Sequence, residues 1–304
     1  MTTRAVPVEA HVDDALVAPA RETGRRRTTA ALTDVSVVIL AGGRGTRLAP
    51  YTSILPKPLM PIGDRSILEL VVDQLTAVGV EDFTFCVGYL SHLIETVFEH
   101  RPPRDAKISY VHESHPLGTA APLKRLDRPR GTFVVMNGDV LSNIRYGDLL
   151  DHHRSSGNVV TIATHEQVIK IEYGIIHLEE GRRVRALEEK PRIVSNVSMG
   201  IYVLEPEALD RIPDEGAFDF PDLVATLLAR GERVGSYRHD GLWFDIGNHD
   251  DYVAAVEVWE RAQVAAANGA SAAAETAAAL GDRRAAAMRR PRRAESTRRV
   301  AAAQ

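Results

Sequence analysis

The sequence VSVVILAGGRGTRL occupies residues 35–48 and joins an apolar run directly to a turn that contains three glycines. The run from Val35 to Leu40 is typical of a buried strand in a parallel sheet. Gly42, Gly43 and Gly45 would let the backbone approach an anion closely and point N–H groups at it. A tight turn from a strand to a helix needs the same residues, so this stretch alone indicates a phosphate-binding loop without proving one.

The glycine turn matches neither of two well-known phosphate-binding motifs. No Gly-Lys-Ser/Thr follows it, which excludes a Walker A loop. Gly43 and Gly45 match the first two glycines of the dinucleotide fingerprint, but Leu48 occupies the third place. Asp64 lies near the distance expected for a ribose-binding acid, yet it follows a proline-rich segment rather than a strand. A dinucleotide-dependent oxidoreductase is therefore the weaker hypothesis.

The residues after this loop alternate between helix-like and strand-like patterns. Ser66 and Glu69 form a capping box, the apolar residues that follow recur at helical spacing, and Gly79 is expected to end that helix. Strand-like runs then occur at Phe83–Val87, Ile108–Val111 and Thr132–Met136. This alternation predicts an α/β fold with a doubly wound, mostly parallel sheet, which binds ligands at the carboxyl ends of its strands.

The second half of the chain is richer in strands. Its strand-like runs are Val159–Ala163, Tyr173–Leu178, Val184–Leu187 and Ile201–Leu204. Helices are expected at Phe220–Arg230 and His249–Arg261. We therefore expect one continuous domain over residues 35–261, with a nucleotide-binding half followed by a strand-rich substrate half.

Two tails flank this domain. Residues 1–34 are rich in Ala, Arg, Thr and Val without periodicity, and residues 262–304 are rich in Ala with repeated Arg pairs. Both are expected to be disordered because they have few large apolar residues to bury. The C-terminal tail holds eight Arg against three acids, so the acidic excess behind the net charge of −4 lies in the domain. An acidic domain makes nucleic acid an unexpected partner.

The remaining composition narrows the class of protein. With 44% hydrophobic and 26% charged residues, the chain is expected to be soluble and globular. No apolar stretch is long enough to span a membrane or to form a signal-peptide core, so a cytoplasmic location is expected. The one cysteine, Cys86, excludes an internal disulfide and is predicted to be a small core residue. The eleven histidines, including His152 and His153, show no metal-ligand spacing and are interpreted as surface residues.

A longer motif begins within the opening stretch. The segment LAGGRGTRLAPYTSILPKPLMPIG, residues 40–63, surrounds a single lysine with prolines. It resembles the opening signature of the sugar-nucleotide pyrophosphorylases, which are nucleoside-triphosphate:sugar-1-phosphate nucleotidyltransferases with a Rossmann-like fold. Further motifs follow in the family order: PLGTA at 116–120, NGD at 137–139, YG at 173–174, EKP at 189–191 and WFDIG at 243–247.

The resemblance is greatest to one part of this family. PLGTA and WFDIG are most similar to the motifs of mannose-1-phosphate guanylyltransferases and of bacterial heptose- or cyclitol-phosphate guanylyltransferases. The C-terminal β-helix of hexapeptide repeats that the family often has finds no counterpart in this sequence.

The resemblance implies a nucleotide site built on the glycine turn. Arg47 and the loop amides would hold the β- and γ-phosphates, and Lys57 would lie near the α-phosphate and the incoming sugar phosphate. Asp139 and Asp245 would bind Mg²⁺, which often takes one or two carboxylates together with phosphate oxygens. Arg47, Lys57 and Asp139 would be the catalytic residues. The nucleotide-binding residues that the resemblance implies are Leu40, Ala41, Gly42, Gly43, Gly45, Thr46, Gly118 and Thr119.

The resemblance also implies a sugar-phosphate site. Lys190 would hold the sugar phosphate, while Gly174 and Glu189 would contact the sugar, because glycine leaves room for a ring and a carboxylate accepts hydrogen bonds from hydroxyls. Ser198 begins a Ser-Met-Gly sequence where Asn-Ala-Gly is common, and Ala121 stands where a second glycine often follows PLGTA. These departures concern the sugar and base pockets, so the substrates stay open. GTP is favoured and dTTP is next, with a sugar or cyclitol 1-phosphate as acceptor.

The implied reaction is a displacement at the α-phosphorus of a nucleoside triphosphate. The nucleophile is an oxygen of the sugar phosphate, whose second pKa near ~6 leaves it mostly ionised at neutral pH. No general base is therefore required, and the sequence offers no His or Cys constellation for nucleophilic catalysis. The protein has to align two polyanions and neutralise charge on the leaving pyrophosphate, which is mainly positioning and electrostatics.

A non-catalytic sugar-nucleotide-binding subunit of the same fold is the alternative hypothesis. Such a subunit would lack the metal carboxylates or the phosphate-binding lysine. Arg47, Lys57, Asp139, Lys190 and Asp245 are all present, which favours the enzyme. The oligomeric state is left open, a homo-oligomer included.

Overall fold

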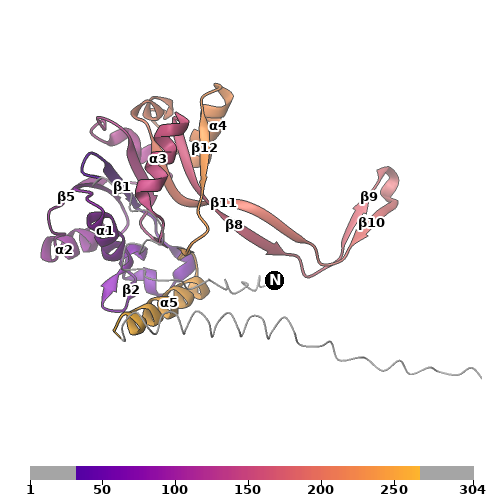
Figure 1. Ribbon diagram of the computed structural model, residues 1–304, viewed down its shortest axis with the longest axis horizontal. Helices are drawn as coiled ribbons and strands as arrows, with labels where there is room; N and C mark the ends of the chain where they lie inside the picture. The colour runs from indigo at the N-terminus through magenta and orange to yellow at the C-terminus, as the bar shows by residue number, and fades with distance from the viewer. Residues whose placement is uncertain (1–31, 268–304) are drawn as a thin grey trace, which may run out of the picture.

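The structure, a computed structural model, describes residues 32–267, and the predictions made for the two tails lie almost wholly outside this range. A seven-stranded sheet forms the centre of the body, with the strand order β12-β8-β11-β6-β1-β4-β5 (Figure 1). Its strands are β1 (Ser36–Ala41), β4 (Asp82–Val87), β5 (Lys107–His112), β6 (Phe133–Asn137), β8 (Val160–Lys170), β11 (Arg192–Leu204) and β12 (Val234–Arg238).

The sheet is mostly parallel, as predicted. β1 runs parallel to β4 and β6, β4 is parallel to β5, and β8 is parallel to β12. β11 is the exception, because it pairs antiparallel with both β6 and β8. The helices are α1 (Ile67–Ala77), α2 (Ser91–His100), α3 (Tyr146–Ser156), α4 (Phe220–Ala229) and α5 (His249–Ala267). Among the described residues, no helix is long and apolar enough to cross a bilayer.

Both faces of the central strand β1 are buried, which explains its continuous apolar sequence. Val37 and Ile39 lie in the larger core, which α1, α2 and α3 cover, while Val38 faces the smaller core beneath α4. Cys86 lies in that smaller core and is fully buried, so its prediction as a core residue is confirmed.

Helix α1 begins where the capping box predicts. Glu69 N–H donates to Ser66 Oγ at 3.3 Å, and Ser66 N–H donates to the Glu69 carboxylate at 2.8 Å. The helix ends at Ala77, followed by Gly79 in a left-handed conformation. Ile67 N–H donates to Met60 O at 3.1 Å, so the start of α1 also fixes the end of the loop that contains Lys57.

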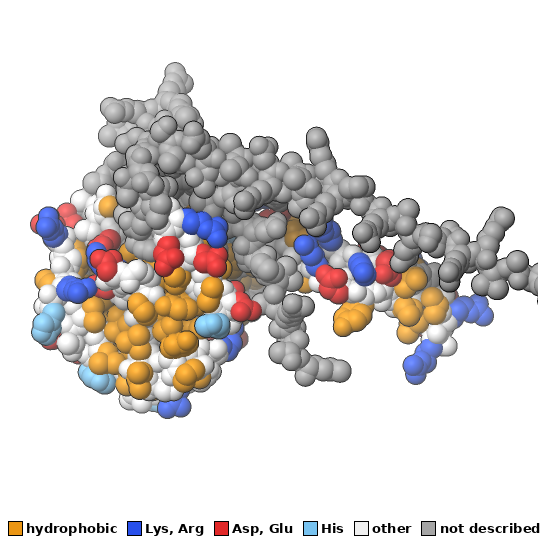
Figure 2. All heavy atoms as spheres, turned by 90° about the horizontal axis from the view of Figure 1, so that it is seen from below, with side chains coloured by type: hydrophobic (Ala, Val, Ile, Leu, Met, Phe, Trp, Pro, Cys, Tyr) orange, Lys and Arg blue, Asp and Glu red, His pale blue; other side chains and the backbone are white. Residues whose placement is uncertain are grey.

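A ribbon of β8 and β11 extends beyond the sheet as an arm (Figure 1). The apolar pattern predicted only its inner part, because its outer residues are largely exposed and carry no core signal. The hairpin of β9 (Ile175–Leu178) and β10 (Val184–Glu188) forms its far end. Figure 2 shows exposed apolar side chains along the arm. The large apolar residues exposed in this segment are Val168, Ile169, Tyr173, Ile176, Leu178, Val184, Leu187, Ile193 and Val194.

His153 corrects one prediction from the sequence. It was expected at the surface, but its side chain is 0% exposed. Its Nδ1 lies 2.8 Å from Thr161 Oγ1, and its Nε2 lies 3.1 Å from Glu205 Oε1. Glu205 also accepts a hydrogen bond from Thr132 at 2.7 Å. The sequence does not reveal that this face of α3 packs on the sheet, so a polar residue there was misassigned.

Burial lowers the pKa of His153 from its ordinary value of 6.5, against the opposing effect of Glu205. As the pH falls, the unfolded chain therefore takes up this proton before the folded chain does. The resulting stabilisation is complete above the unfolded pKa and is lost as the pH falls from 6.5 towards the folded pKa.

We predict that His153→Gln lowers the free energy of unfolding by about 1–3 kcal/mol near neutral pH, because the buried polar network loses a member. The stability of the variant should also fall less than that of the wild type as the pH is lowered from about 7 to about 5. Denaturant unfolding across this range measures both effects, with His152→Gln as the matched control. A wild-type pH slope in the His153 variant would contradict a neutral, buried imidazole.

Candidate active site

The loop after β1 folds back on itself through three short helical turns, η1 (Thr46–Leu48), η2 (Tyr51–Ser53) and η3 (Lys57–Leu59). Gly45 adopts a φ of 60°, and a Cβ on it would lie 3.0 Å from Lys57 Cβ and 3.1 Å from Thr52 Cγ2. Thr52 Oγ1 donates to Gly45 O at 2.9 Å. Because Gly45 has no side chain, the glycine turn can lie directly against Lys57.

Lys57 is the buried cation of this region, with 8% of its surface exposed. Its Nζ forms an ion pair with Asp139 Oδ2 and lies 4.0 Å from Asp245 Oδ1. Three residues that the sequence assigned to the site thus come together, although 188 positions separate the first from the last.

A small two-stranded sheet explains why the two carboxylates meet. β7 (Val140–Ser142) pairs antiparallel with β13 (Trp243–Asp245), which sets Asp245 opposite Val140. Ile246 N–H also donates to Asp139 O at 3.3 Å. Gly138 N–H donates to Leu40 O at 2.9 Å. This hydrogen bond fixes the residue before Asp139 to the end of β1.

The carboxylate pair has the character of a cation site. The pKa of Asp245 is raised by burial and by the negative charge of Asp139, with Lys57 and Arg47 acting in the opposite direction. Asp139 Oδ1 is buried without a hydrogen-bond partner. An unsatisfied oxygen beside a second carboxylate fits a hard cation such as Mg²⁺, which takes oxygen ligands. Within residues 32–267, no group of three or more His, Cys, Asp or Glu could hold a metal, so the pair would rely on oxygens of a ligand.

Arg47 lies beside the start of α5. A Cβ placed on Gly247 would be 3.5 Å from an Arg47 terminal nitrogen and 3.5 Å from Asp251 Oδ2. Asn248 holds Asp251 through a 2.6 Å hydrogen bond. Asp251 was not identified from the sequence, where it shows only the spacing of a helix-capping pair with Asn248. The structure thus adds a second acidic residue near Arg47.

The PLGTA segment (residues 116–120), for which the family resemblance implies contact with the nucleotide base, is called the base-side loop, and it is attached to the start of α4. Gly118 has a φ of 89°, and a Cβ on it would lie 2.8 Å from Phe218 O. Thr119 donates to Asp219 Oδ1 from both its N–H, at 2.8 Å, and its hydroxyl, at 3.0 Å. The Thr119 hydroxyl also accepts from Phe220 N–H at 2.9 Å. Asp219 was not found from the sequence, because its partner is 100 residues away.

The remaining nucleotide-binding candidates line the same edge of the sheet. Leu40 and Ala41 end β1, Gly42 O accepts from Tyr89 N–H at 3.2 Å, and Thr46 begins η1. A Cβ on Gly43 would meet no atom within 4 Å. The glycine turn is therefore open on one side and packed on the other.

The sugar-side candidates lie apart from this cluster. Gly174 precedes β9, and Glu189 and Lys190 follow β10, so all three belong to the exposed end of the arm (Figure 1). A Cβ on Gly174 would lie 3.0 Å from Glu189 Oε2, so these two do face each other. Ser198 stands nearer the body, where its hydroxyl donates to Tyr202 OH at 3.1 Å. In this conformation the arm does not bring Glu189 or Lys190 to Lys57.

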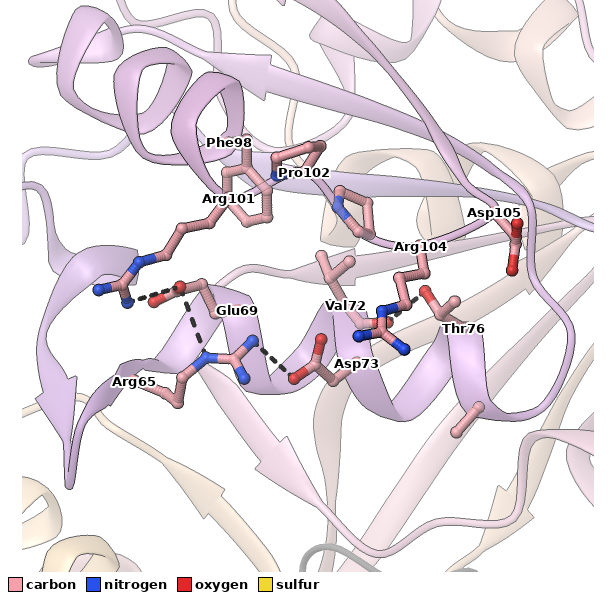
Figure 3. Close-up of a pocket in the computed structure, with 12 residues that line it drawn as sticks. Arg65, Glu69, Val72, Asp73, Thr76, Phe98, Arg101, Pro102, Arg104 and Asp105 are labelled. Atoms are coloured by element: carbon pink, nitrogen blue, oxygen red, sulfur yellow. Dashed lines mark hydrogen bonds and ion pairs between the residues drawn. The ribbon is translucent and has the colours of Figure 1, made fainter.

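A cavity of about 500 Å³ lies elsewhere, between α1 and the segment that follows α2 (Figure 3). Arg65 contacts Asp73 at 2.6 Å, and Arg65 and Arg101 each approach Glu69 at 3.5 Å. These arginines are already paired with carboxylates, and none of the predicted site residues lines the cavity. It is therefore not the candidate active site.

Comparison with known proteins agrees with this fold and this set of motifs. Residues 36–261 match the family described as Nucleotidyl transferase, and the chain belongs to that family. Mannose-1-phosphate guanyltransferase of Yarrowia lipolytica is 32% identical over 224 residues, covering 71% of this chain and 61% of that protein. Mannose-1-phosphate guanyltransferase beta-B of Xenopus laevis is 32% identical over 227 residues, covering 72% and 63%. The chain thus spans about three fifths of the length of these curated relatives.

Solved structures share the fold. HddC from Yersinia pseudotuberculosis superimposes with a TM-score of 0.59 at 24% identity, covering 73% of this chain and 98% of HddC. The same protein complexed with GMP-PN gives 0.58 at the same identity and coverage. A putative glucose-1-phosphate thymidylyltransferase from Bacillus anthracis gives 0.59 at 20% identity, covering 74% and 95%. The predicted α/β fold and the predicted family are both confirmed.

We predict that Gly118→Ala lowers the free energy of unfolding by about 1–3 kcal/mol, because a side chain must adopt a positive φ and meets a carbonyl oxygen. Gly131→Ala is the matched control, since a Cβ there meets nothing within 4 Å. Denaturant unfolding of both variants makes the comparison. If the two variants were equally stable, a side chain at position 118 would not strain the attachment of the base-side loop to α4.

Proposed function

We propose that this chain is a sugar-1-phosphate nucleotidyltransferase. It joins a nucleoside triphosphate to a sugar or cyclitol 1-phosphate and releases pyrophosphate and a nucleoside-diphosphate sugar. The observation that carries the proposal is the buried Lys57 between Asp139 and Asp245, directly against the glycine turn. Membership of the nucleotidyl transferase family and the mannose-1-phosphate guanyltransferase relatives support it.

The reaction depends more on stabilising the negative charge of the phosphates than on acid–base catalysis. An ionised oxygen of the sugar phosphate forms a bond to the α-phosphorus, and the bond from that phosphorus to the bridging oxygen of pyrophosphate breaks. The Lys57 ammonium supplies a buried positive charge beside the glycine turn, where backbone N–H groups and Arg47 receive the phosphates. A preorganised charge in a site with little water is worth more than the same charge in bulk solvent.

Asp139 and Asp245 would hold Mg²⁺. When bound, the ion would neutralise negative charge on the triphosphate and the leaving pyrophosphate. Lys57 contacts the same two carboxylates, so it orients them and limits their mutual repulsion before substrates enter.

GTP is the favoured nucleotide and dTTP the second choice. The curated relatives are named as guanyltransferases, and HddC is described in complex with GMP-PN. A putative thymidylyltransferase shares the fold, which keeps dTTP as an alternative. A pyrophosphate-release screen that crosses five nucleoside triphosphates with sugar and cyclitol phosphates tests the function. Tight binding of nucleotide sugars without turnover of any pair would favour a non-catalytic subunit.

The sugar-phosphate role of Glu189 and Lys190 requires movement of the arm. The arm leaves the sheet at an irregularity between Ser198 and Tyr202, where Gly200 adopts a φ of 72°. Few buried contacts hold its outer part, and such segments are the ones that move most easily. We infer that the arm turns at this irregularity and carries Lys190 towards Lys57 when the sugar phosphate binds.

We predict that Lys57→Ala and Arg47→Ala each lower kcat/KM by at least ~100-fold, because each removes a preorganised charge at the reacting phosphates. Exposed Lys107→Ala and Arg128→Ala are matched controls from outside the site. Steady-state pyrophosphate release measures the effect, with thermal unfolding to verify the fold. A folded variant with near-wild-type kinetics would remove that residue from the mechanism.

We predict that Lys190→Ala raises the KM for the sugar phosphate by roughly tenfold or more, because a charge-assisted hydrogen bond contributes about 1.5–3 kcal/mol. The KM for the nucleotide should change little. Arg185→Ala, an exposed cation on the same hairpin, is the matched control. An unchanged KM for the sugar phosphate would mean that the arm does not reach the substrate.

A further inference from the structure

The cavity between α1 and the segment that follows α2 takes no part in the proposed reaction, yet it has the form of a ligand site (Figure 3). Its volume of about 500 Å³ lies within the usual range for small-molecule pockets, which is about 300–1,000 Å³. One wall is apolar, because the buried side chains of Val72 and Phe98 line it together with Pro102 and Pro103. An organic group can pack against this wall while a charged group faces the polar rim.

Three arginines line the rim of the cavity. Arg65 comes from β3 (Arg65–Ser66), and Arg101 and Arg104 come from the segment after α2. Arg65 forms an ion pair with Asp73 at 2.6 Å. The exposed Arg104 guanidinium forms no ion pair or hydrogen bond within residues 32–267, and Asp105, which follows it, lies apart from it in Figure 3. The cavity therefore offers one unpaired guanidinium group beside two others.

The contacts of the other two arginines with Glu69 are loose. Arg65 Nε and a terminal nitrogen of Arg101 each lie 3.5 Å from Glu69 Oε1, which is longer than an ordinary hydrogen bond. Among the described residues, Arg65 Nε and Glu69 Oε1 are buried without a hydrogen-bond partner. Unsatisfied buried polar atoms are uncommon and cost free energy. A ligand oxygen at this point would give Arg65 the acceptor that it lacks.

The cavity adjoins the loop that carries Lys57. β3 pairs antiparallel with β2 (Pro61–Ile62), so Arg65 is fixed to the end of that loop. The start of α1 is fixed to the same loop, because Ile67 N–H donates to Met60 O at 3.1 Å. A ligand that holds Arg65 against the segment after α2 therefore restrains the Lys57 loop from outside the active site.

We propose that this cavity is a second ligand site, which binds a phosphate ester with an apolar organic group. Its phosphate contacts Arg65, Arg101 and Arg104, and its organic group packs against Phe98. A ligand with a single carboxylate would only replace the carboxylates already present. A phosphate ester instead brings a charge of about −1.5 to −2 and three acceptor oxygens, and guanidinium groups bind such oxygens in pairs of hydrogen bonds. The proposal does not rest on the proposed function, because no active-site residue lines the cavity.

Phenyl phosphate is the probe, because it joins a phosphate to an apolar ring. Calorimetry on the full chain should show binding that Arg104→Ala weakens by roughly tenfold or more, the equivalent of one hydrogen bond between charged groups. Lys107→Ala, an exposed cation outside the cavity, is the matched control and should leave this binding unchanged. Inorganic phosphate and benzoate should each bind more weakly than the probe, because each lacks one of its two groups.

Lys57→Ala separates this cavity from the glycine turn, which also receives phosphate in the proposed function. Binding of phenyl phosphate should persist in Lys57→Ala and weaken in Arg104→Ala. The reverse result would place the probe at the glycine turn, which would refute the second site and leave the proposed function intact. No binding of the probe to the wild type, or equal affinity for the wild type and Arg104→Ala, would also overturn the second site.

Hydrogen exchange tests the link between the cavity and the Lys57 loop. A bound ligand suppresses each local opening that destroys its site, by roughly 100-fold when its concentration is about 100 times Kd. Phenyl phosphate should therefore slow exchange of the Ile67 amide in the wild type, and much less at the same concentration in Arg104→Ala. If the probe binds in an Arg104-dependent way and leaves Ile67 exchange unchanged, the cavity does not restrain the loop.

Discussion

A buried ammonium between two carboxylates holds the two ends of the domain together. Lys57 comes from the loop after the first strand, whereas Asp245 ends the last strand. A buried charge is costly unless it is paired, and removal of one partner leaves the other uncompensated. The Lys57 charge therefore requires Asp139 and Asp245 nearby, and the two carboxylates require a positive charge between them. The loop of residues 42–62 and the β7–β13 pair cannot separate without breaking this balance.

The remainder of the fold positions this cluster at the carboxyl ends of the strands. β1 lies inside the sheet between β4 and β6, so the glycine turn, Gly88 and Asn137 all end at one edge. Small residues matter there because side chains would collide: a Cβ on Gly138 would lie 3.1 Å from Ile39 Cγ2. The opposite, strand-rich half supplies β13 and the arm. A buried end of the sheet is thus combined with an exposed ribbon, which suits the proposed reaction between two polyanions.

The sequence predicts most elements of this protein but not the reach of the arm. The ranges of β9, β10 and α4 agree with the predicted ranges to within two residues at each end. β1 and α1 follow from an apolar run and the Ser66–Glu69 capping box, because both signals are local and reflect burial. The ribbon beyond Ala163 has no apolar periodicity, so its length could not be derived. Asp219 was missed since its partner is distant in sequence, and the burial of His153 depends on how α3 docks. The motif resemblance implies one site for Lys57, Asp139 and Asp245, and the three side chains do lie close together. It gives no information on where the arm lies.

We propose that Asp139 and Asp245, which Lys57 holds together in the structure, act as one unit to bind Mg²⁺. A double-mutant cycle with Asn at each position tests it, with kcat titrated against Mg²⁺ and unfolding free energy measured alongside. Each single change should raise the Mg²⁺ requirement and reduce kcat sharply, and the double change should cost little more than the worse single change, because residues that act together are strongly non-additive. If the two carboxylates serve only to neutralise the buried Lys57 charge, each change should lower the free energy of unfolding and leave the Mg²⁺ requirement unchanged. Stability losses with an unchanged Mg²⁺ dependence would contradict a shared Mg²⁺ site.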